Sequence, residues 1–178
     1  MTFGSSGVIN INATVSGITK ANGDYADSTL VNPYQEIFPA GTYTASITSS
    51  GTSLLQASYG GWSFDINTPT TPTYLEDFAA FNDNGGSPVM SSSVIEYQSS
   101  SNYLTSAQAL AGAAGWTATF ILPTTETLDF VVPDNYLPDN TGGVSVAITR
   151  TGAAPEPVCL WIAVAGTLLG VRSRRRMN

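Results

Sequence analysis

The sequence has no histidine, a single cysteine and few charged residues. Of its 178 residues, 6 are basic and 13 are acidic, so charged side chains make up 11% of the chain and its net charge is −7. Without histidine the chain can form no Ser-His-Asp or Cys-His nucleophile and no His-ligated zinc site. One cysteine can close no internal disulfide and form no Cys-x-x-Cys metal pair. The acidic balance argues against nucleic acid as a partner.

Hydrophobic residues account for 42% of the chain, which is enough to bury a core in one domain with an appendage. The charges divide the sequence unevenly. Residues 1–157 hold two basic and all thirteen acidic residues, whereas residues 158–178 hold four arginines and no acid. Such a change in the sign of the charge along the sequence predicts a boundary between two parts with different surroundings. We therefore expect a domain over residues 1–148, a linker over residues 149–157 and a tail over residues 158–178.

The tail follows the motif Pro155-Glu156-Pro157 and opens with the uncharged run VCLWIAVAGTLLGV (residues 158–171). A cluster of basic residues comes next: Arg172, Arg174, Arg175 and Arg176. In a helix this run spans about 21 Å, against about 30 Å for the hydrocarbon core of a bilayer. Arginines after an apolar run favour keeping that end in the cytoplasm. The run predicts a short hydrophobic helix, either at the inner membrane or buried as the last core helix of the domain.

This order of Pro-Glu-Pro, hydrophobic helix and arginine cluster resembles the PEP-CTERM sorting signal of Gram-negative bacteria, over residues 155–176. The resemblance implies that an exosortase in the inner membrane recognises Pro155-Glu156-Pro157 and that the tail is removed. The mature protein would then reach the cell surface or the exopolysaccharide matrix. Exported proteins begin with a basic segment and then an apolar one. Residues 1–7 have neither, so we expect the true start of the protein to lie upstream.

Strand periodicity dominates the domain. Apolar and polar residues alternate in residues 8–15, 41–48 and 116–122, and the pattern returns in residues 128–132 and 144–148. The positions predicted to face the core are Ile9, Ile11, Ala13, Val15, Tyr43, Ala45, Ile47, Trp116, Ala118, Phe120, Leu122, Leu128, Phe130, Val132, Val144, Val146 and Ile148. Turn-forming residues separate these segments. The pattern predicts an all-β domain, an antiparallel β-sandwich or jelly roll, followed by the short C-terminal hydrophobic helix.

Two segments have helical spacing of their apolar residues. The first runs from Tyr74 to Phe81, and the second, residues 106–114, is rich in alanine but is interrupted by a glycine. Both are too short to form a helical layer. Glu76 and Asp77 are adjacent in the first segment and would point apart on a helix or a strand. We therefore do not expect them to act as an acid/base pair in glycoside hydrolysis.

The segment from Leu128 to Ile148 predicts two strands joined by an acidic loop. The loop contains Asp134 and Asp139, each followed by an asparagine, and then two glycines. Carboxylate and amide oxygens are ligands that Ca²⁺ prefers, and glycines let backbone carbonyls approach an ion. A divalent cation would also relieve the repulsion between the two carboxylates. Since Asp, Asn and Gly are equally common in solvated turns, the loop is either a calcium site or a plain turn.

This loop resembles the C-terminal hairpin of calcium-dependent, galactose-binding bacterial lectins. The resemblance implies one Ca²⁺ held by the side chains of Asp134, Asp139 and Asn140 and by a carbonyl near Tyr136. A further carbonyl, from Phe38 in the turn Phe38-Pro39-Ala40-Gly41, is implied in the same way. In the lectins the sugar hydroxyls coordinate the ion directly. Asp139 replaces an asparagine and the loop is shorter, so the resemblance extends further for the metal than for the sugar.

These observations lead to three functional hypotheses. The first is a non-catalytic, exported binding module with calcium in the loop and extracellular polysaccharide as its ligand. The second is a structural protein of the matrix, whose low charge and Ser/Thr-rich surface serve packing. The third is a hydrolase that uses carboxylates alone, such as Asp65 with Glu96, and nothing in their spacing supports it. Trp62 and Trp116 either present rings to a sugar or, as is usual for large aromatics, belong to the core.

Overall fold

The computed structural model describes residues 2–21, 24–49, 59–62, 72–83, 93–134 and 137–154. These residues form mostly strands: β1 (Ser6–Asn12), β2 (Gly17–Ala21), β3 (Asp24–Val31), β4 (Tyr34–Phe38), β5 (Gly41–Ile47), β6 (Tyr59–Trp62), β7 (Pro72–Leu75), β8 (Phe78–Asn82), β9 (Ile95–Tyr97), β10 (Thr117–Leu122), β11 (Glu126–Val131) and β12 (Thr141–Ala153). All pairings between these strands are antiparallel. The predicted all-β class is confirmed.

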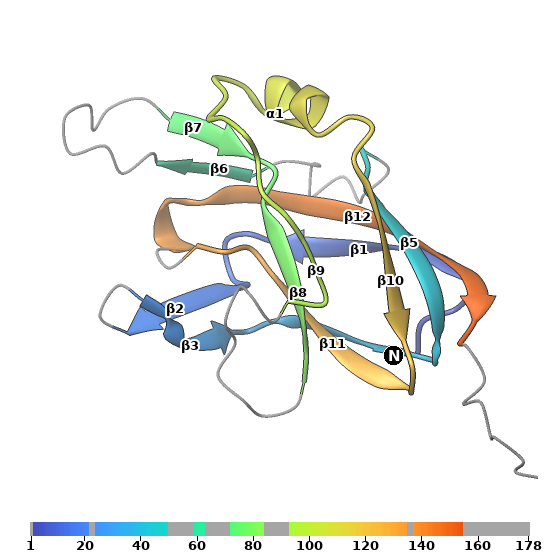
Figure 1. The fold of residues 1–178 in the computed structure, drawn as a ribbon. Coiled ribbons are helices and arrows are strands. Elements are labelled where there is room, and N and C mark those ends of the chain that lie inside the picture. Colours follow the sequence, from blue (N-terminus) through green and yellow to red (C-terminus); the bar gives the residue numbers. More distant parts are fainter. Residues whose placement is uncertain are drawn as a thin grey trace, which may run out of the picture.

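The larger sheet is organised around β12, the longest strand, which crosses the molecule in orange in Figure 1. β12 pairs with β1, β5 and β6, while β10 pairs with β5 and β7 pairs with β6. Its apolar residues Val144, Val146 and Ile148 are buried, and Thr149 on the opposite face is exposed. These apolar residues face the core as the sequence predicts, although Ser145 on the opposite face is also buried, where its hydroxyl donates to Asn10 Oδ1 at 2.8 Å.

The smaller sheet has four strands in the order β4-β11-β8-β9. Its inward side chains belong to the same buried cluster as those of the larger sheet. At the centre of that cluster the Phe38 ring of β4 lies 4.5 Å from Phe3 and 5.4 Å from Tyr43, and the Tyr43 ring stacks on Phe120 at 5.2 Å, centroid to centroid. Such aromatic pairs add stability beyond the area they bury. The core therefore joins the two sheets through aromatic rings.

The β2–β3 ribbon covers the outer face of the smaller sheet. Ile18 and Leu30 of the ribbon pack against Ala79, Phe81 and Val131 in a second buried cluster. Figure 1 shows the ribbon beside β8 and β11 at the lower left. Since both faces of β8 and β11 are thereby covered, four consecutive residues of each strand are buried.

The helix indicated by the apolar spacing of Tyr74 to Phe81 is not formed, and the double coverage of β8 explains why. The segment forms β7 and β8 instead of a helix. A strand buried on both faces has no alternation of apolar and polar residues, so its sequence gives no period-two signal. The second helical segment is confirmed as α1 (Ser106–Gly112), which begins where Thr105 Oγ1 accepts a hydrogen bond from Gln108 N at 3.2 Å.

The boundary predicted at residue 148 is too early. β12 continues to Ala153, because Arg150 still pairs with β5 and, after a register shift, so do Gly152 and Ala153. Residues 149–153 are therefore strand and not linker. The predicted C-terminal helix, the Pro-Glu-Pro motif and the arginine cluster lie outside the described residues. Within the described part of the chain, no helix is long and apolar enough to cross a membrane.

Candidate functional site

The predicted acidic loop is the connection between β11 and β12 (residues 132–140), called here the β11–β12 connection. Its first part runs beside the segment that joins β1 to β2. Val132 N donates to the Ser16 carbonyl at 3.2 Å, and Ile18 N donates to the Asp134 carbonyl at 3.0 Å. These two hydrogen bonds fix the backbone of Asp134 against a segment far from it in the sequence.

Asn140 fixes the other end of the connection. Its Nδ2 donates to the Ala13 carbonyl at 3.2 Å, while Ala13 N donates to the Gly142 carbonyl at 3.1 Å. A carbonyl can only accept a hydrogen bond, so this contact fixes which end of the amide faces Ala13. The remaining atom, Asn140 Oδ1, is buried and accepts no hydrogen bond within the described residues. Asn140 itself is only 5% exposed.

A close approach of two backbones makes this arrangement possible. A Cβ at Gly17 would lie 2.7 Å from the Asp134 carbonyl oxygen and would collide with the Leu137 side chain. Leu137 begins the short 3₁₀ helix η2 (Leu137–Asp139), and Asn140 N donates to its carbonyl at 3.1 Å. Glycine is thus the residue that lets the two segments approach so closely.

The structure brings some of the predicted ligands together and not others. Asp134 and Asn140 lie in the same connection, at opposite ends of its described backbone. Asp139 ends η2, but its side chain lies outside the described part, as does the whole of Tyr136.

Phe38 is not brought to the connection. It pairs with Glu126 at the start of β11, whereas the connection leaves the end of that strand, about 17 Å further along at the usual rise per residue. In the turn after Phe38, a backbone carbonyl is already bound to a cationic side chain, because the Arg150 guanidinium donates to the Ala40 carbonyl. The register of β4 on β11 therefore removes Phe38 from the predicted ligand set.

Asp77 is a neighbour of the connection that the sequence did not indicate. β8 pairs with β11 so that Ala79 is opposite Val131, and the start of β8 therefore lies beside the start of the connection. Burial raises the pKa of Asp77, the negative charge of Asp134 raises it further, and hydrogen bonds from Ser99 lower it. One of those bonds runs from Ser99 N to Asp77 Oδ1 at 2.5 Å. Finding this neighbour from sequence would have required the strand order.

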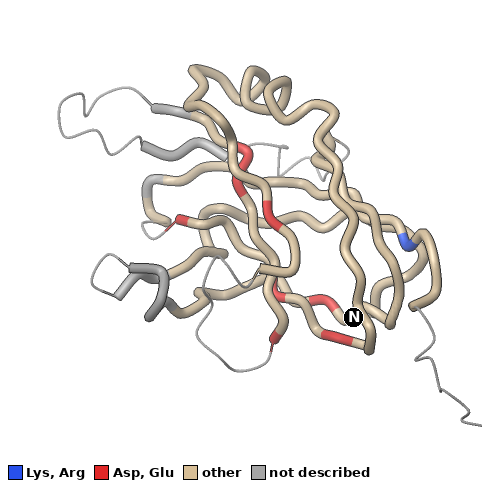
Figure 2. The backbone as a smooth tube through the Cα atoms, in the orientation of Figure 1, with Lys and Arg blue, Asp and Glu red and all other residues tan. Residues whose placement is uncertain are grey.

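The wider electrostatics are acidic. Figure 2 shows the acidic residues, in red, distributed over the smaller sheet and its connections. Arg150, near the end of β12, is the only basic side chain in the part of the chain whose side chains are described. Within the described residues, no three Asp, Glu, Cys or His side chains group so as to hold a metal ion. A metal at the connection would therefore need amide or backbone oxygens as well as carboxylates.

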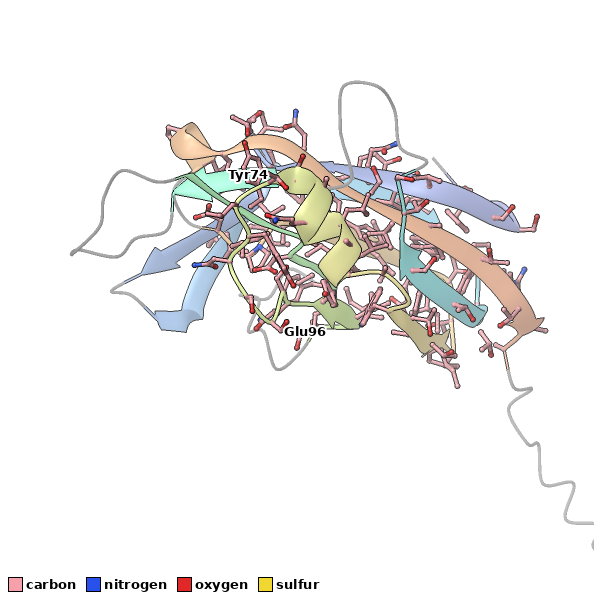
Figure 3. All side chains as sticks on the ribbon, turned by 90° about the horizontal axis from the view of Figure 1, so that it is seen from above. Tyr74 and Glu96 are labelled. Atoms are coloured by element: carbon pink, nitrogen blue, oxygen red, sulfur yellow. The ribbon has the colours of Figure 1, made fainter. Side chains whose placement is uncertain are left out.

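The other candidates are placed as follows. The Trp116 ring lies 5.6 Å from Phe78 and 5.2 Å from Tyr97, centroid to centroid, and packs against the core as its aromatic character suggests. Glu96 is exposed, and Figure 3 shows it at the edge of the molecule, well apart from Tyr74. Asp65, the Trp62 side chain and the sorting-signal residues lie outside the described part.

Comparison of the chain with protein-family models, with curated proteins and with solved structures gives no match.

Proposed function

We propose that the chain is an exported, exosortase-sorted protein of the cell surface or extracellular matrix, with a non-catalytic, calcium-binding β-sandwich as its body. The two sheets that share one aromatic core support the sandwich, since antiparallel sheets packed face to face are that architecture. The calcium would lie at the β11–β12 connection, with Asp134, Asp139 and Asn140 as side-chain ligands.

The observation that carries the calcium proposal is the buried Oδ1 of Asn140. A buried acceptor without a hydrogen bond costs about 1–3 kcal/mol, and native proteins rarely leave one unsatisfied. The amide cannot turn over to satisfy it, because Nδ2 is held by Ala13. A hard cation is a partner for an amide oxygen, and Asp134 in the same connection contributes the negative charge that a cation requires.

The calcium proposal is tested by melting the protein with about 10 mM CaCl₂ and with EGTA. Extracellular calcium sites often bind at about 10⁻⁴–10⁻³ M, so saturating calcium should stabilise the fold by about 1.4–2.7 kcal/mol. Asp134→Asn and Asp139→Asn should abolish this increment. Asp83→Asn, at an exposed aspartate after β8, is the matched control and should keep it. An increment that survives in both loop variants, or is absent from the wild type, contradicts the proposal.

Asn140→Asp separates a ligand role from a purely structural one. Aspartate keeps an oxygen at the position of Oδ1 but loses the donor to Ala13. If the residue is a ligand, the variant should be less stable in EGTA and should recover with calcium more than the wild type does. If the amide only ties the connection to β1, the loss of stability should be the same with and without calcium.

The export proposal depends on the resemblance of residues 155–176 to a sorting signal and is tested independently. Mass spectrometry of the mature protein should recover peptides from the β-strand domain and none from Trp161 onward. The control is Pro155→Ala with Pro157→Ala, which should leave the tail on the protein. An intact tail on the wild-type surface protein would contradict sorting by an exosortase, without bearing on calcium.

A purely structural matrix protein without a ligand is the second candidate. The outer face of β5 and β10 favours it, because its side chains are Thr42, Thr44, Ser46, Thr117, Thr119 and Ile121, with no charge among them. Screening on a glycan array with and without calcium distinguishes the two candidates. Binding that requires calcium supports the lectin-like module, and no binding under either condition supports the structural protein.

A further inference from the structure

β10 forms one edge of the larger sheet. Within the described residues it pairs with β5 alone, so the N–H and C=O groups on its other side face no described strand. Figure 1 shows β10 on the near side of the molecule. The side chains that point away from the core, Thr117, Thr119 and Ile121, are all exposed, and Ile121 is 54% exposed. An edge of this kind can accept a further strand.

β10 lacks the features that normally prevent such pairing. Protected edges carry charges or proline, are very short, contain a bulge or are covered. The six residues of β10 include no charge and no proline, and their register with β5 is uninterrupted.

The edges of the smaller sheet, by contrast, are protected. β9 has three residues with Glu96 in the middle. β4 contains Glu36, and the N-terminal segment covers part of it, since Thr2 bridges to Ile37 and Phe3 N donates to the Ile37 carbonyl.

β1, another edge of the larger sheet, is uncharged but less accessible than β10. Of its outward residues only Ser6, at the start of the strand, is exposed, and Val8, Asn10 and Asn12 are half-buried, whereas every outward residue of β10 is exposed. β10 also has the residue types that favour sheet formation, with Thr and Ile at its outward positions. Of the two, β10 is therefore the better site for an added strand.

The distribution of charge favours the same edge. Residues 1–157 hold thirteen acids and two basic residues, so two copies of the chain repel each other over most of their surfaces. No charged residue occurs between Glu96 and Glu126, a stretch that contains all of β10. The adjacent outward residues of β5 are Thr42, Thr44 and Ser46. Two copies can therefore meet along β10 without burying charge or bringing acids together.

We propose that β10 is a self-association edge, at which two copies of this chain pair antiparallel about a twofold axis. A strand paired antiparallel with its own copy is self-complementary, and the twofold contact closes after two subunits. The larger sheets of the two copies become one continuous sheet. Outward Thr and Ile residues of one copy lie beside those of the other, and β-branched cross-strand pairs of this kind are favourable. This proposal is independent of calcium.

The first test is the solution mass of the full chain, measured by light scattering during size-exclusion chromatography. The wild type should have twice the chain mass of 18.6 kDa, in calcium and in EGTA alike. The double variant Thr119→Lys with Ile121→Lys should be monomeric, because it brings lysines together at the twofold axis. Thr149→Lys with Thr151→Lys is the matched control, on the same sheet but in β12, and should stay dimeric. Circular dichroism and melting establish that both variants fold.

Cross-linking identifies the edge. Thr117→Cys, Thr119→Cys and Ile121→Cys are made in a Cys159→Ser background, then oxidised alone and mixed in pairs. Directly opposed residues on antiparallel strands have Cα atoms about 4.5–5.5 Å apart, within the range of a disulfide. At least one combination should give a covalent dimer, and Thr149→Cys should give none. A monomeric wild type, a dimer unaffected by the β10 lysines, or no cross-link at β10 would each overturn the proposal.

Discussion

The two ends of the smaller sheet are held in different ways. At the end where β4 meets β5, Phe38, Tyr43 and Phe120 are fully or almost fully buried; Tyr43 stacks on Phe120, and Phe38 meets both rings edge to face. The Tyr43 hydroxyl donates to the Pro39 carbonyl at 2.5 Å, so its only polar atom is satisfied. At the other end, the β11–β12 connection is held by hydrogen bonds to the β1–β2 segment and buries the Asn140 amide. We call the first the aromatic end. The second, which is polar and close to acidic residues, is called the polar end.

This difference explains why a ligand is expected at only one end. Stacked rings need no partner beyond one another, so the aromatic end is complete without a ligand. The polar end buries Asn140 Oδ1 without a hydrogen bond from the described residues, and in the same connection the negative charge of Asp134 acts on the neighbouring Asp77. A cation would satisfy the amide oxygen and reduce the repulsion together.

The largest effect is expected at the aromatic end. Phe38→Ala removes a side chain that contacts Phe3, Tyr43, Phe120 and Phe130. It should lower the free energy of unfolding by about 3–5 kcal/mol, as measured by urea denaturation. Leu104→Ala is the control, because Leu104 is 68% exposed, and it should change stability by no more than about 0.5 kcal/mol. The loss in Phe38→Ala should be equal in calcium and in EGTA.

A smaller effect is expected where the polar end depends on close backbone approach. Gly17→Ala adds a Cβ that would lie 2.7 Å from the Asp134 carbonyl oxygen, so the connection must shift. We expect a loss of about 1–3 kcal/mol together with a weaker stabilisation by calcium. Gly4→Ala has no atom within 4 Å of the added Cβ and should be neutral in both measurements. If calcium stabilised Gly17→Ala as much as the wild type, the metal site would not depend on the geometry of the β11–β12 connection.

The smallest effect is a pH dependence at Asp77. Burial raises the pKa of this carboxyl above its ordinary value of 3.8, so the folded chain holds the proton more tightly than the unfolded chain does. The free energy of unfolding therefore falls as the pH rises from below 3.8 through the raised pKa. Asp77→Asn keeps an acceptor for Ser99 N and removes this dependence.

The readout is the stability of Asp77→Asn relative to the wild type from pH 3 to pH 7, in EGTA, by urea denaturation at about unit steps. The variant should gain relative to the wild type as the pH rises. Asp83→Asn, at an exposed site, shows how much of any gain comes from removing one negative charge from an acidic chain. A constant difference across the range for Asp77→Asn would mean that folding does not raise the pKa of Asp77.

The sequence predicted the strands that have one face in the core, because alternation is visible there. Val144, Val146 and Ile148 are buried as expected, and so are Leu128 and Phe130. β8 was missed because the β2–β3 ribbon covers its outer face and removes the alternation. Val15 is 45% exposed although the pattern placed it inward, because β1 ends at Asn12 and the chain turns there.

The candidate site was predicted only as far as it is local in sequence. Asp134 and Asn140 lie in the one connection between β11 and β12, which the sequence alone indicates, although the two strands belong to different sheets and form no hairpin. Phe38 and Asp77 depend on which strands are neighbours and in what register, and the sequence contains no such information. Phe38 was therefore assigned to the wrong end of β11, and Asp77 was not assigned at all.

The most direct test of the calcium proposal is a crystal structure of the protein grown with about 10 mM CaCl₂. We predict an ion about 2.3–2.6 Å from Asn140 Oδ1 and from a carboxylate oxygen of Asp134, and its loss from crystals washed in EGTA. A hydrogen bond to Oδ1 from a water molecule or another protein group, with no ion in the calcium-grown crystals, would contradict it.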